Sequence, residues 1–135
     1  MRCCCLWLLA AGAFLGASAC ANTSTSTSPS APAITFTGSV APYGTSSQTI
    51  EAATAGTLTL TLTWNGNVDL DLYLTDDLCS GYPPDACSIL TRSTASSGNH
   101  EEVTWPVKKQ QRFKVWADNF SPNAGADYTV VAVIR

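Results

Sequence analysis

The chain contains 135 residues, of which 45% are hydrophobic and 13% are charged, and its formal net charge is −3. All charged residues between positions 33 and 91 are acidic, and this mildly acidic balance argues against nucleic acid as the main partner. Once the N-terminal segments described next are set apart, roughly 100 residues remain, which suits one domain with its own hydrophobic core.

The N-terminus has the organisation of a secretory signal. Arg2 supplies the charged start, an apolar stretch covers residues 6–15, and small residues follow as far as Cys20. The apolar stretch is roughly ten to fourteen residues long, which is short for a membrane span and favours cleavage over retention. We therefore predict a signal peptide over residues 1–19.

Residues 15–20, with the sequence Leu-Gly-Ala-Ser-Ala-Cys, resemble the lipobox of bacterial lipoproteins. The resemblance implies that Cys20 carries a lipid and that this lipid anchors the exported protein to a bacterial membrane. Ala21, rather than an aspartate, follows the cysteine, which favours the outer membrane or the cell surface. Residues 20–32 continue with serine, threonine and proline and contain no large apolar side chain, so we expect a disordered tether.

The cysteines separate into groups along the chain. Three of them, at positions 3–5, belong to the predicted signal, and Cys20 is the predicted lipidation site. The remaining pair, Cys79 and Cys87, flanks a short segment that contains a Pro-Pro sequence. In an exported protein such a pair predicts a disulfide. Metal binding by the two thiolates is the alternative, but no histidine or further cysteine accompanies them.

Two adjacent segments have the alternation of half-buried β-strands. Residues 57–64 alternate threonine with leucine and end on tryptophan, so that the large apolar side chains share one face. Residues 68–74 alternate leucine with polar side chains in the same way. Because the Asn-Gly-Asn sequence at 65–67 is a tight-turn signal, we predict that the two strands form a hairpin.

Other segments show the same strand pattern, and none outside the signal has a helical stripe of apolar residues. Further strands are predicted at residues 34–37, 49–53, 88–92, 101–105, 112–117 and 128–134. About eight short strands separated by turns predict an all-β fold, a single antiparallel β-sandwich over residues 33–135.

The two central strands and the turn between them carry a family resemblance. Residues 55–74 read Ala-Gly-Thr-Leu-Thr-Leu-Thr-Leu-Thr-Trp, then Asn-Gly-Asn, then Val-Asp-Leu-Asp-Leu-Tyr-Leu. This succession resembles the bacterial pre-peptidase C-terminal (PPC) domain family, and residues 125–130 are similar to the closing strand of that family. The resemblance covers residues 34–134. It implies a jelly-roll-like β-sandwich that usually accompanies secreted peptidases as an accessory module, and it supplies no catalytic residues.

This chain departs from the family pattern in two respects. No peptidase precedes the domain in this sequence, so we expect any function to belong to the module itself. The segment between Cys79 and Cys87 is an elaboration of a strand connection.

Asp69 and Asp71 are the sharpest candidates for a metal site. Alternate residues of a strand point the same way about 6.5–7 Å apart, and leaning side chains could bring two carboxylates to one Ca²⁺ ion. Asp76 and Asp77 follow at the strand end and could add ligands. The spacing is not that of the twelve-residue calcium loop, and the alternative is a polar strand face that caps the adjacent turn. We predict no other cofactor.

We predict that the protein is not an enzyme. His100 is the only histidine, and no serine lies in a Gly-x-Ser-x-Gly motif. Glu101 and Glu102 do not make a glycosidase pair, because adjacent residues of a strand face opposite sides of the sheet. A hydrolase with an unrecognised acidic site is a much weaker possibility.

Three aromatic residues are candidates for ligand binding. Trp64 and Trp105 lie on apolar tracks and are assigned to the core, whereas Trp116 falls on a polar track. Tyr73 shares the Asp69–Asp71 face, and Tyr82 lies between the two cysteines. Exposed rings on a sandwich stack on sugars or anchor a protein partner. A slip of one residue in register turns Trp116 into the core, so both placements stay open.

These observations predict an extracytoplasmic lipoprotein whose β-sandwich is a non-catalytic binding or accessory module. Its expected partners are the membrane, through the N-terminal lipid, and an envelope polysaccharide or protein, with a possible link to Ca²⁺. The alternative is a structural subunit of an envelope assembly with no free ligand.

Overall fold

The computed structural model describes residues 31–81, 87–96 and 98–135, so the predicted signal and most of the predicted tether lie outside the described residues. The described residues form eight strands. Among them no helix is long and apolar enough to cross a membrane. In chain order the strands are β1 (Ala33–Val40), β2 (Thr45–Glu51), β3 (Gly56–Trp64), β4 (Leu70–Asp76), β5 (Ile89–Ser93), β6 (His100–Val107), β7 (Arg112–Asn119) and β8 (Ala126–Ile134).

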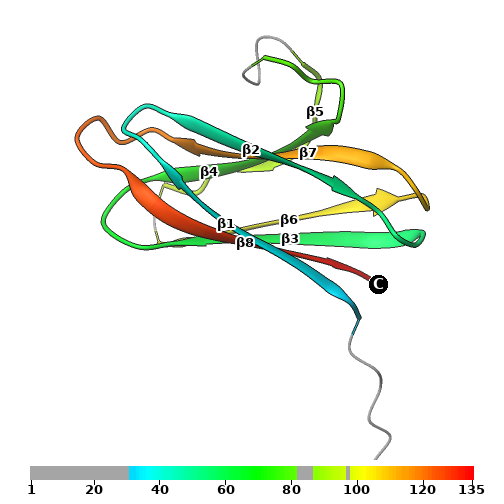
Figure 1. The fold of residues 1–135 in the computed structure, drawn as a ribbon. Coiled ribbons are helices and arrows are strands. Elements are labelled where there is room, and N and C mark those ends of the chain that lie inside the picture. The colour runs from blue at the N-terminus through cyan, green and yellow to red at the C-terminus, as the bar shows by residue number, and fades with distance from the viewer. Residues whose placement is uncertain (1–30, 82–86, 97) are drawn as a thin grey trace, which may run out of the picture.

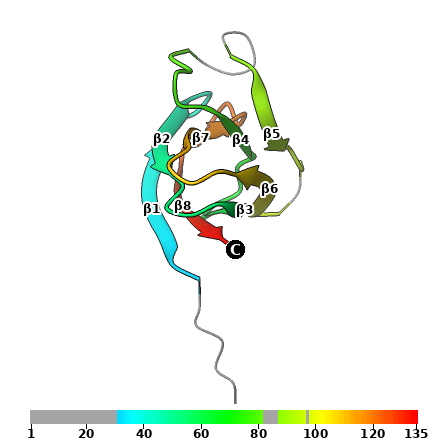
Figure 2. The ribbon, with the colours of Figure 1, turned by 90° about the vertical axis from the view of Figure 1, so that its right-hand side faces the viewer.

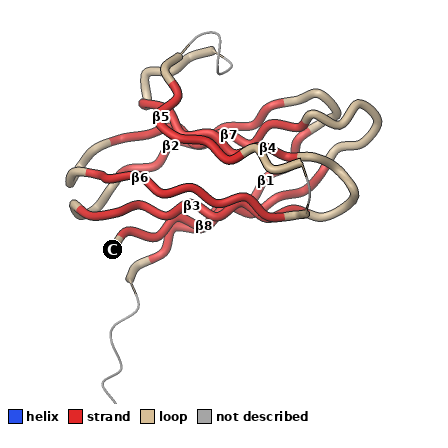
Figure 3. Tube along the Cα trace, turned by 180° about the vertical axis from the view of Figure 1, so that it is seen from behind, coloured by secondary structure: helices blue, strands red, loops and turns tan. Residues whose placement is uncertain are grey.

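The strands form two four-stranded sheets that lie face to face (Figures 1 and 2). The first sheet has the order β1-β8-β3-β6, the second has the order β2-β7-β4-β5, and every neighbouring pair is antiparallel. This order is that of a jelly roll, in which β1 pairs with β8, β2 with β7, β3 with β6 and β4 with β5. The predicted antiparallel sandwich of about eight strands is confirmed, and Figure 3 shows both layers from behind.

The predicted hairpin between the two leucine-rich strands is wrong. β3 pairs with β6 and β8, whereas β4 pairs with β5 and β7, so the two strands lie in different sheets. The connection between them crosses from one sheet to the other, which lets both leucine faces enter the same core. Within this connection the Trp64 indole N–H donates to the Val68 carbonyl over 2.9 Å, and Gly66 has a positive φ of 84°.

The core lies between the inner faces of the sheets. Leu58, Leu60 and Leu62 from β3 are at most 1% exposed, and the three leucines of β4 are fully buried. Each such side chain contributes about 1.5–3 kcal/mol through its burial. Trp64 belongs to this core and Trp105 packs against it, as the alternation predicted.

One tyrosine joins the two sheets through the core. Tyr128 in β8 lies directly opposite Gly38 in β1, and its hydroxyl donates to Ser46 Oγ of β2 over 2.8 Å. A Cβ atom added at Gly38 would lie 2.6 Å from the Tyr128 hydroxyl oxygen. A glycine is therefore required here so that the ring can cross from the first sheet to the second.

Candidate functional site

The outer face of the β2-β7-β4-β5 sheet carries a second buried cluster, separate from the main core. Tyr73 of β4 and Trp116 of β7 lie directly opposite each other on this face. They are 5% and 7% exposed, and Cys79, Cys87 and Ile89 pack with them. The outer face of a two-layer sandwich is ordinarily solvated, so a buried aromatic pair there must be covered by another segment.

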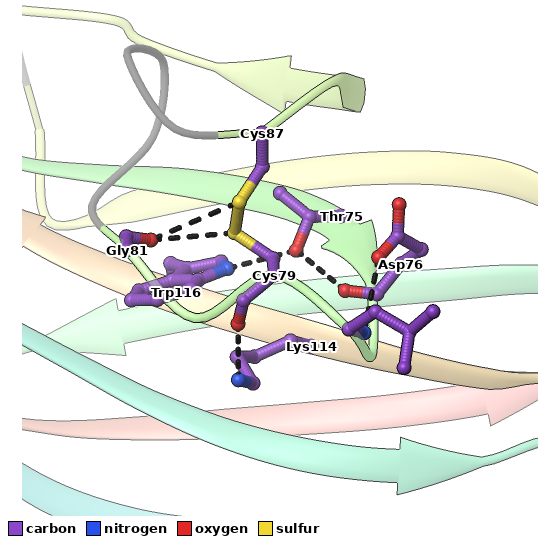
Figure 4. Close-up of a disulfide and its surroundings, with 8 residues drawn as sticks. Thr75, Asp76, Cys79, Gly81, Cys87, Lys114 and Trp116 are labelled. Carbon is purple, nitrogen blue, oxygen red and sulfur yellow. Dashed lines mark hydrogen bonds between the residues drawn. A yellow bond between two sulfur atoms is a disulfide. The ribbon is translucent and has the colours of Figure 1, made fainter.

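That segment is closed by the Cys79–Cys87 disulfide, which confirms the predicted pairing, with the two Cα atoms 5.5 Å apart. Figure 4 shows the disulfide beside the Trp116 ring. The Trp116 indole N–H donates to Thr75 Oγ1 over 3.0 Å. The Lys114 ammonium lies 5.5 Å from the centre of the Trp116 ring and donates to the Cys79 carbonyl. The Lys114 hydrogen bond thus ties Cys79 to β7, and the disulfide holds Cys87 beside Cys79 over the aromatic pair.

The two cysteines determine how exposed the predicted ligand-binding rings are. Tyr73 and Trp116 do point to the outer face, as the period-two pattern required, but both are buried there. For Trp116 neither of the two open placements is observed, since its ring is not exposed and does not lie in the main core. The reason is the disulfide segment, whose contacts with β4 and β7 the alternation of the strands does not encode. Tyr82 lies outside the described residues.

Two aspartates lie side by side on the same outer face. Asp71 of β4 is opposite Asp118 of β7, and they are 7% and 4% exposed. The Tyr73 hydroxyl donates to Asp71 Oδ2 over 2.9 Å. Burial raises the pKa of Asp71 to about 6; the Tyr73 hydrogen bond opposes this shift, and the nearby charges of Asp69, Glu101 and Asp118 add to it.

Asp69 lies just before β4 and is half-buried, and its backbone N–H donates to Ser121 Oγ over 2.8 Å. The described residues contain no group of three or more histidine, cysteine, aspartate or glutamate side chains placed to hold a metal. Calcium binding by Asp69 and Asp71 stays a prediction. A thermal melt with excess Ca²⁺ and then with chelator tests it, since a site filled to about 100 times its dissociation constant adds about 2.7 kcal/mol.

A buried carboxylate in β6 has a structural role that the sequence pattern did not predict. Glu101 is 1% exposed, and it accepts hydrogen bonds from the Ser93 hydroxyl and, over 2.8 Å, from the Ala95 N–H. Its inward position follows from the alternation it shares with Val103 and Val107, whereas Glu102 is exposed. Glu101 thus fastens the connection between β5 and β6.

One end of the sandwich holds a further arrangement that the sequence pattern did not predict. Asn119 at the end of β7 donates its side-chain amide to the carbonyls of Ala41 and Ala124, over 3.0 and 2.8 Å. Its side-chain oxygen accepts the Ser121 N–H. The β1–β2 and β7–β8 connections are thereby held side by side (Figure 1). Between them opens a cleft of about 290 Å³, lined by Tyr43, Thr45, Asp118, Asn119 and Phe120.

No protein-family model matches the chain, and no curated protein matches it. Solved structures do match. The pre-peptidase C-terminal domain of a collagenase from Bacillus anthracis superposes with a TM-score of 0.54 at 18% identity, covering 73% of this chain and 87% of that one. The chain has a PPC-like fold.

Two further structures share the sandwich. PliG, a periplasmic inhibitor of g-type lysozyme from Aeromonas hydrophila, gives a TM-score of 0.53 at 14% identity, covering 78% of this chain and 88% of that one. The Yersinia pseudotuberculosis-derived mitogen gives a TM-score of 0.54 at 15% identity, covering 78% of this chain and 87% of that one. At these identities the likeness concerns the fold alone.

Proposed function

We propose that the protein is an extracytoplasmic lipoprotein, anchored through Cys20, whose β-sandwich is a non-catalytic binding module for an envelope polysaccharide or protein. The observation that carries the proposal is the Cys79–Cys87 disulfide, which packs on Tyr73 and Trp116 at the outer face of the sheet. Disulfides persist in oxidising compartments outside the cytoplasm, in keeping with the predicted signal. A disulfide limits the conformations of the chain beside it, and such preorganisation lowers the entropy that is lost when a partner binds.

The structural likenesses support the proposal of a non-catalytic module. A collagenase PPC domain and a periplasmic lysozyme inhibitor have this fold; the first is part of an enzyme and the second inhibits one. Membership of the PPC family is part of the proposal, supported by the motif at residues 55–74 and by the jelly-roll strand order.

The anchor is tested by cell fractionation. Cys20→Ser should move the protein from the membrane fraction to the soluble fraction and abolish incorporation of a labelled fatty acid. Cys3→Ser is the matched control, because it changes a cysteine of the predicted signal but leaves the proposed lipidation site intact. Retention of the Cys20→Ser protein in the membrane would show that the lipobox interpretation is wrong.

The binding role is tested with the full-length protein in detergent. Retention on an affinity gel that carries envelope polysaccharide, or saturable binding to one envelope protein, supports a binding module. Isolation only as a fixed-ratio member of a larger complex, with no exchangeable ligand, would favour the alternative of a structural subunit. Turnover of a substrate that a single carboxylate substitution abolishes would overturn the non-catalytic assignment.

A further inference from the structure

The cleft between the β1–β2 and β7–β8 connections is rigidly built. The Tyr43 N–H donates to the Ser121 carbonyl over 3.2 Å, and the Asn119 N–H donates to the Gly44 carbonyl over 2.9 Å. Together with the Asn119 side chain, these bonds tie the two connections to the end of β7. A ligand that enters the cleft therefore meets walls that are already in place.

Two aromatic side chains stand at the cleft with much of their surface in solvent. Tyr43 is 71% exposed and Phe120 is 46% exposed, and both line the cleft. Tyr43 also has a positive φ of 49°, a conformation that is uncommon for a bulky residue. Such conformations persist where the surrounding structure imposes them, and they cluster at binding sites.

The polar side of the cleft is acidic. Asp118, which is 4% exposed, lines it, and Asp71 lies directly opposite Asp118 on the neighbouring strand. Asp69 adds a further charge that acts on Asp71. Among the described residues that line the cleft none is basic. Negative charge in a concave, partly desolvated site attracts a cation more strongly than the same charge on an open surface does.

We propose that this cleft binds a cationic side chain, lysine or arginine, of a partner polypeptide, with the charge directed to Asp118 beside the Tyr43 and Phe120 rings. Aromatic faces attract a cation through the ring quadrupole, and a carboxylate adds a charge-assisted hydrogen bond. A carboxylate has about four acceptor positions, so Asp118 can receive a ligand in addition to a contact within the protein. A neutral sugar would use the rings but not the accumulated charge, and an anionic ligand would be repelled.

This inference rests on the proposed binding role and is tested separately from it. The full-length protein in detergent is titrated with the peptide acetyl-Gly-Lys-Gly-amide and with its matched neutral analogue acetyl-Gly-Gln-Gly-amide. We expect weak, saturable binding of the lysine peptide alone. Phe120→Ala and Tyr43→Asn should each weaken it about three- to fivefold, since an exposed cation–π contact is worth about that much. Asparagine is chosen for Tyr43 because it tolerates a positive φ.

Asp118→Asn should weaken binding more than either ring variant, provided that its melting temperature shows it to be folded. Glu51→Gln is the control for charge, because it removes one negative charge from an exposed position at the far end of β2 and should change binding less than 1.5-fold. The ring variants change exposed side chains, so the test remains decisive even if the buried Asp118→Asn protein fails to fold.

If Glu51→Gln and Phe120→Ala weaken binding of the lysine peptide equally, the proposal is overturned. Such a result would mean that the net charge of the protein, and not the cleft, attracts the peptide. Binding of the neutral oligosaccharide cellotetraose, lost in Phe120→Ala, with no binding of the lysine peptide would identify the cleft as a sugar site and would also overturn it. If the lysine peptide fails to bind while the protein still binds envelope material, the inference fails and the binding role stands.

Discussion

Asp71 is a carboxylate whose environment makes the stability of the fold depend on pH. Its pKa is raised from 3.8 to about 6, so the folded protein binds more protons than the unfolded chain between about pH 4 and pH 6. The free energy of unfolding therefore decreases as the pH rises through this window, and the loss is complete above it. Asp71→Asn keeps an acceptor for the Tyr73 hydroxyl and removes the charge.

We expect Asp71→Asn to raise the free energy of unfolding at pH 7.5 by about 1–2 kcal/mol and to leave it nearly unchanged at pH 4. Denaturant unfolding at the two pH values measures this difference, with Glu51→Gln as the control for net charge. An equal effect at both pH values would show that the substitution acts through packing rather than through titration.

The Trp116 indole offers a second prediction for a single residue. Its N–H donates to Thr75 Oγ1, and Thr75 is fully buried. Thr75→Val keeps the shape and leaves the indole N–H without a partner, which should cost about 1–3 kcal/mol in denaturant unfolding. Thr75→Ser keeps the hydroxyl and should lose clearly less. A Thr75→Val protein that is as stable as the wild type would contradict a stabilising role for this hydrogen bond.

How far single residues could be placed from the sequence depends on which force positions them. The inward position of Glu101 follows from period-two alternation, and so does the outward direction of Tyr73. The burial of Trp116 and the role of Asn119 do not follow, because both depend on contacts with connections far away in sequence. From the sequence, Tyr43 is only an aromatic residue in a Pro-Tyr-Gly turn. Nothing near it in the sequence indicates that the β7–β8 connection lies beside it.

Among the elements, the Cys79–Cys87 disulfide leads to a prediction with two separate measurements. Cys79→Ala with Cys87→Ala removes a short closed loop, which should cost about 2–3 kcal/mol by chain entropy. Because the segment covers Trp116 and Tyr73, the same change should expose the indole and shift tryptophan emission to longer wavelength. Reductant should shift the emission of the wild-type protein in the same way and should leave the emission of the double variant unchanged. Unchanged emission in the double variant would mean that packing, without the covalent bond, keeps the cover in place.

The connections at the opposite end depend on one side chain. Asn119→Ala deprives the carbonyls of Ala41 and Ala124 and the Ser121 N–H of their partner, so we expect a loss of about 2–4 kcal/mol. Hydrogen exchange should show faster exchange of the Tyr43 and Ser121 amides than in the wild type. Asn99→Ala is the comparison, since it removes a side-chain amide that bridges carbonyls of another connection and should leave these amides protected. Equal exchange rates in the wild type and Asn119→Ala would contradict the tethering role.

The existence of the strands is encoded locally, whereas their partners are not. Alternation predicted all eight strands, and the observed bounds differ from the predicted ones by a few residues. The Asn-Gly-Asn turn signal at 65–67 suggested that β3 and β4 pair, but it serves equally well in a connection between two sheets. The leucine faces of β3 and β4 need only point into the same core. Strands in opposite sheets meet this condition as well as strands that pair within one sheet.

At the scale of the whole molecule, the strand order governs how fast the chain can fold. Only the β4–β5 partners are adjacent in sequence; β1 pairs with β8, β2 with β7, and β3 with both β6 and β8. Most of the sheet therefore forms only after long loops have closed, and this entropic cost precedes the gain from pairing. We expect refolding of the oxidised protein from denaturant in milliseconds to seconds, as for other β-sandwiches.

Stopped-flow fluorescence after a short unfolding pulse, which keeps prolines in their native isomers, measures this rate. Gly38→Ala should slow or abolish refolding, because the added methyl group meets the Tyr128 ring that joins the two sheets. Tyr128→Phe removes only the hydroxyl bond to Ser46 and should cost about 1 kcal/mol while folding proceeds. A wild-type refolding phase in microseconds would mean that local pairs form most of the stabilising structure, which a jelly roll with this strand order does not allow.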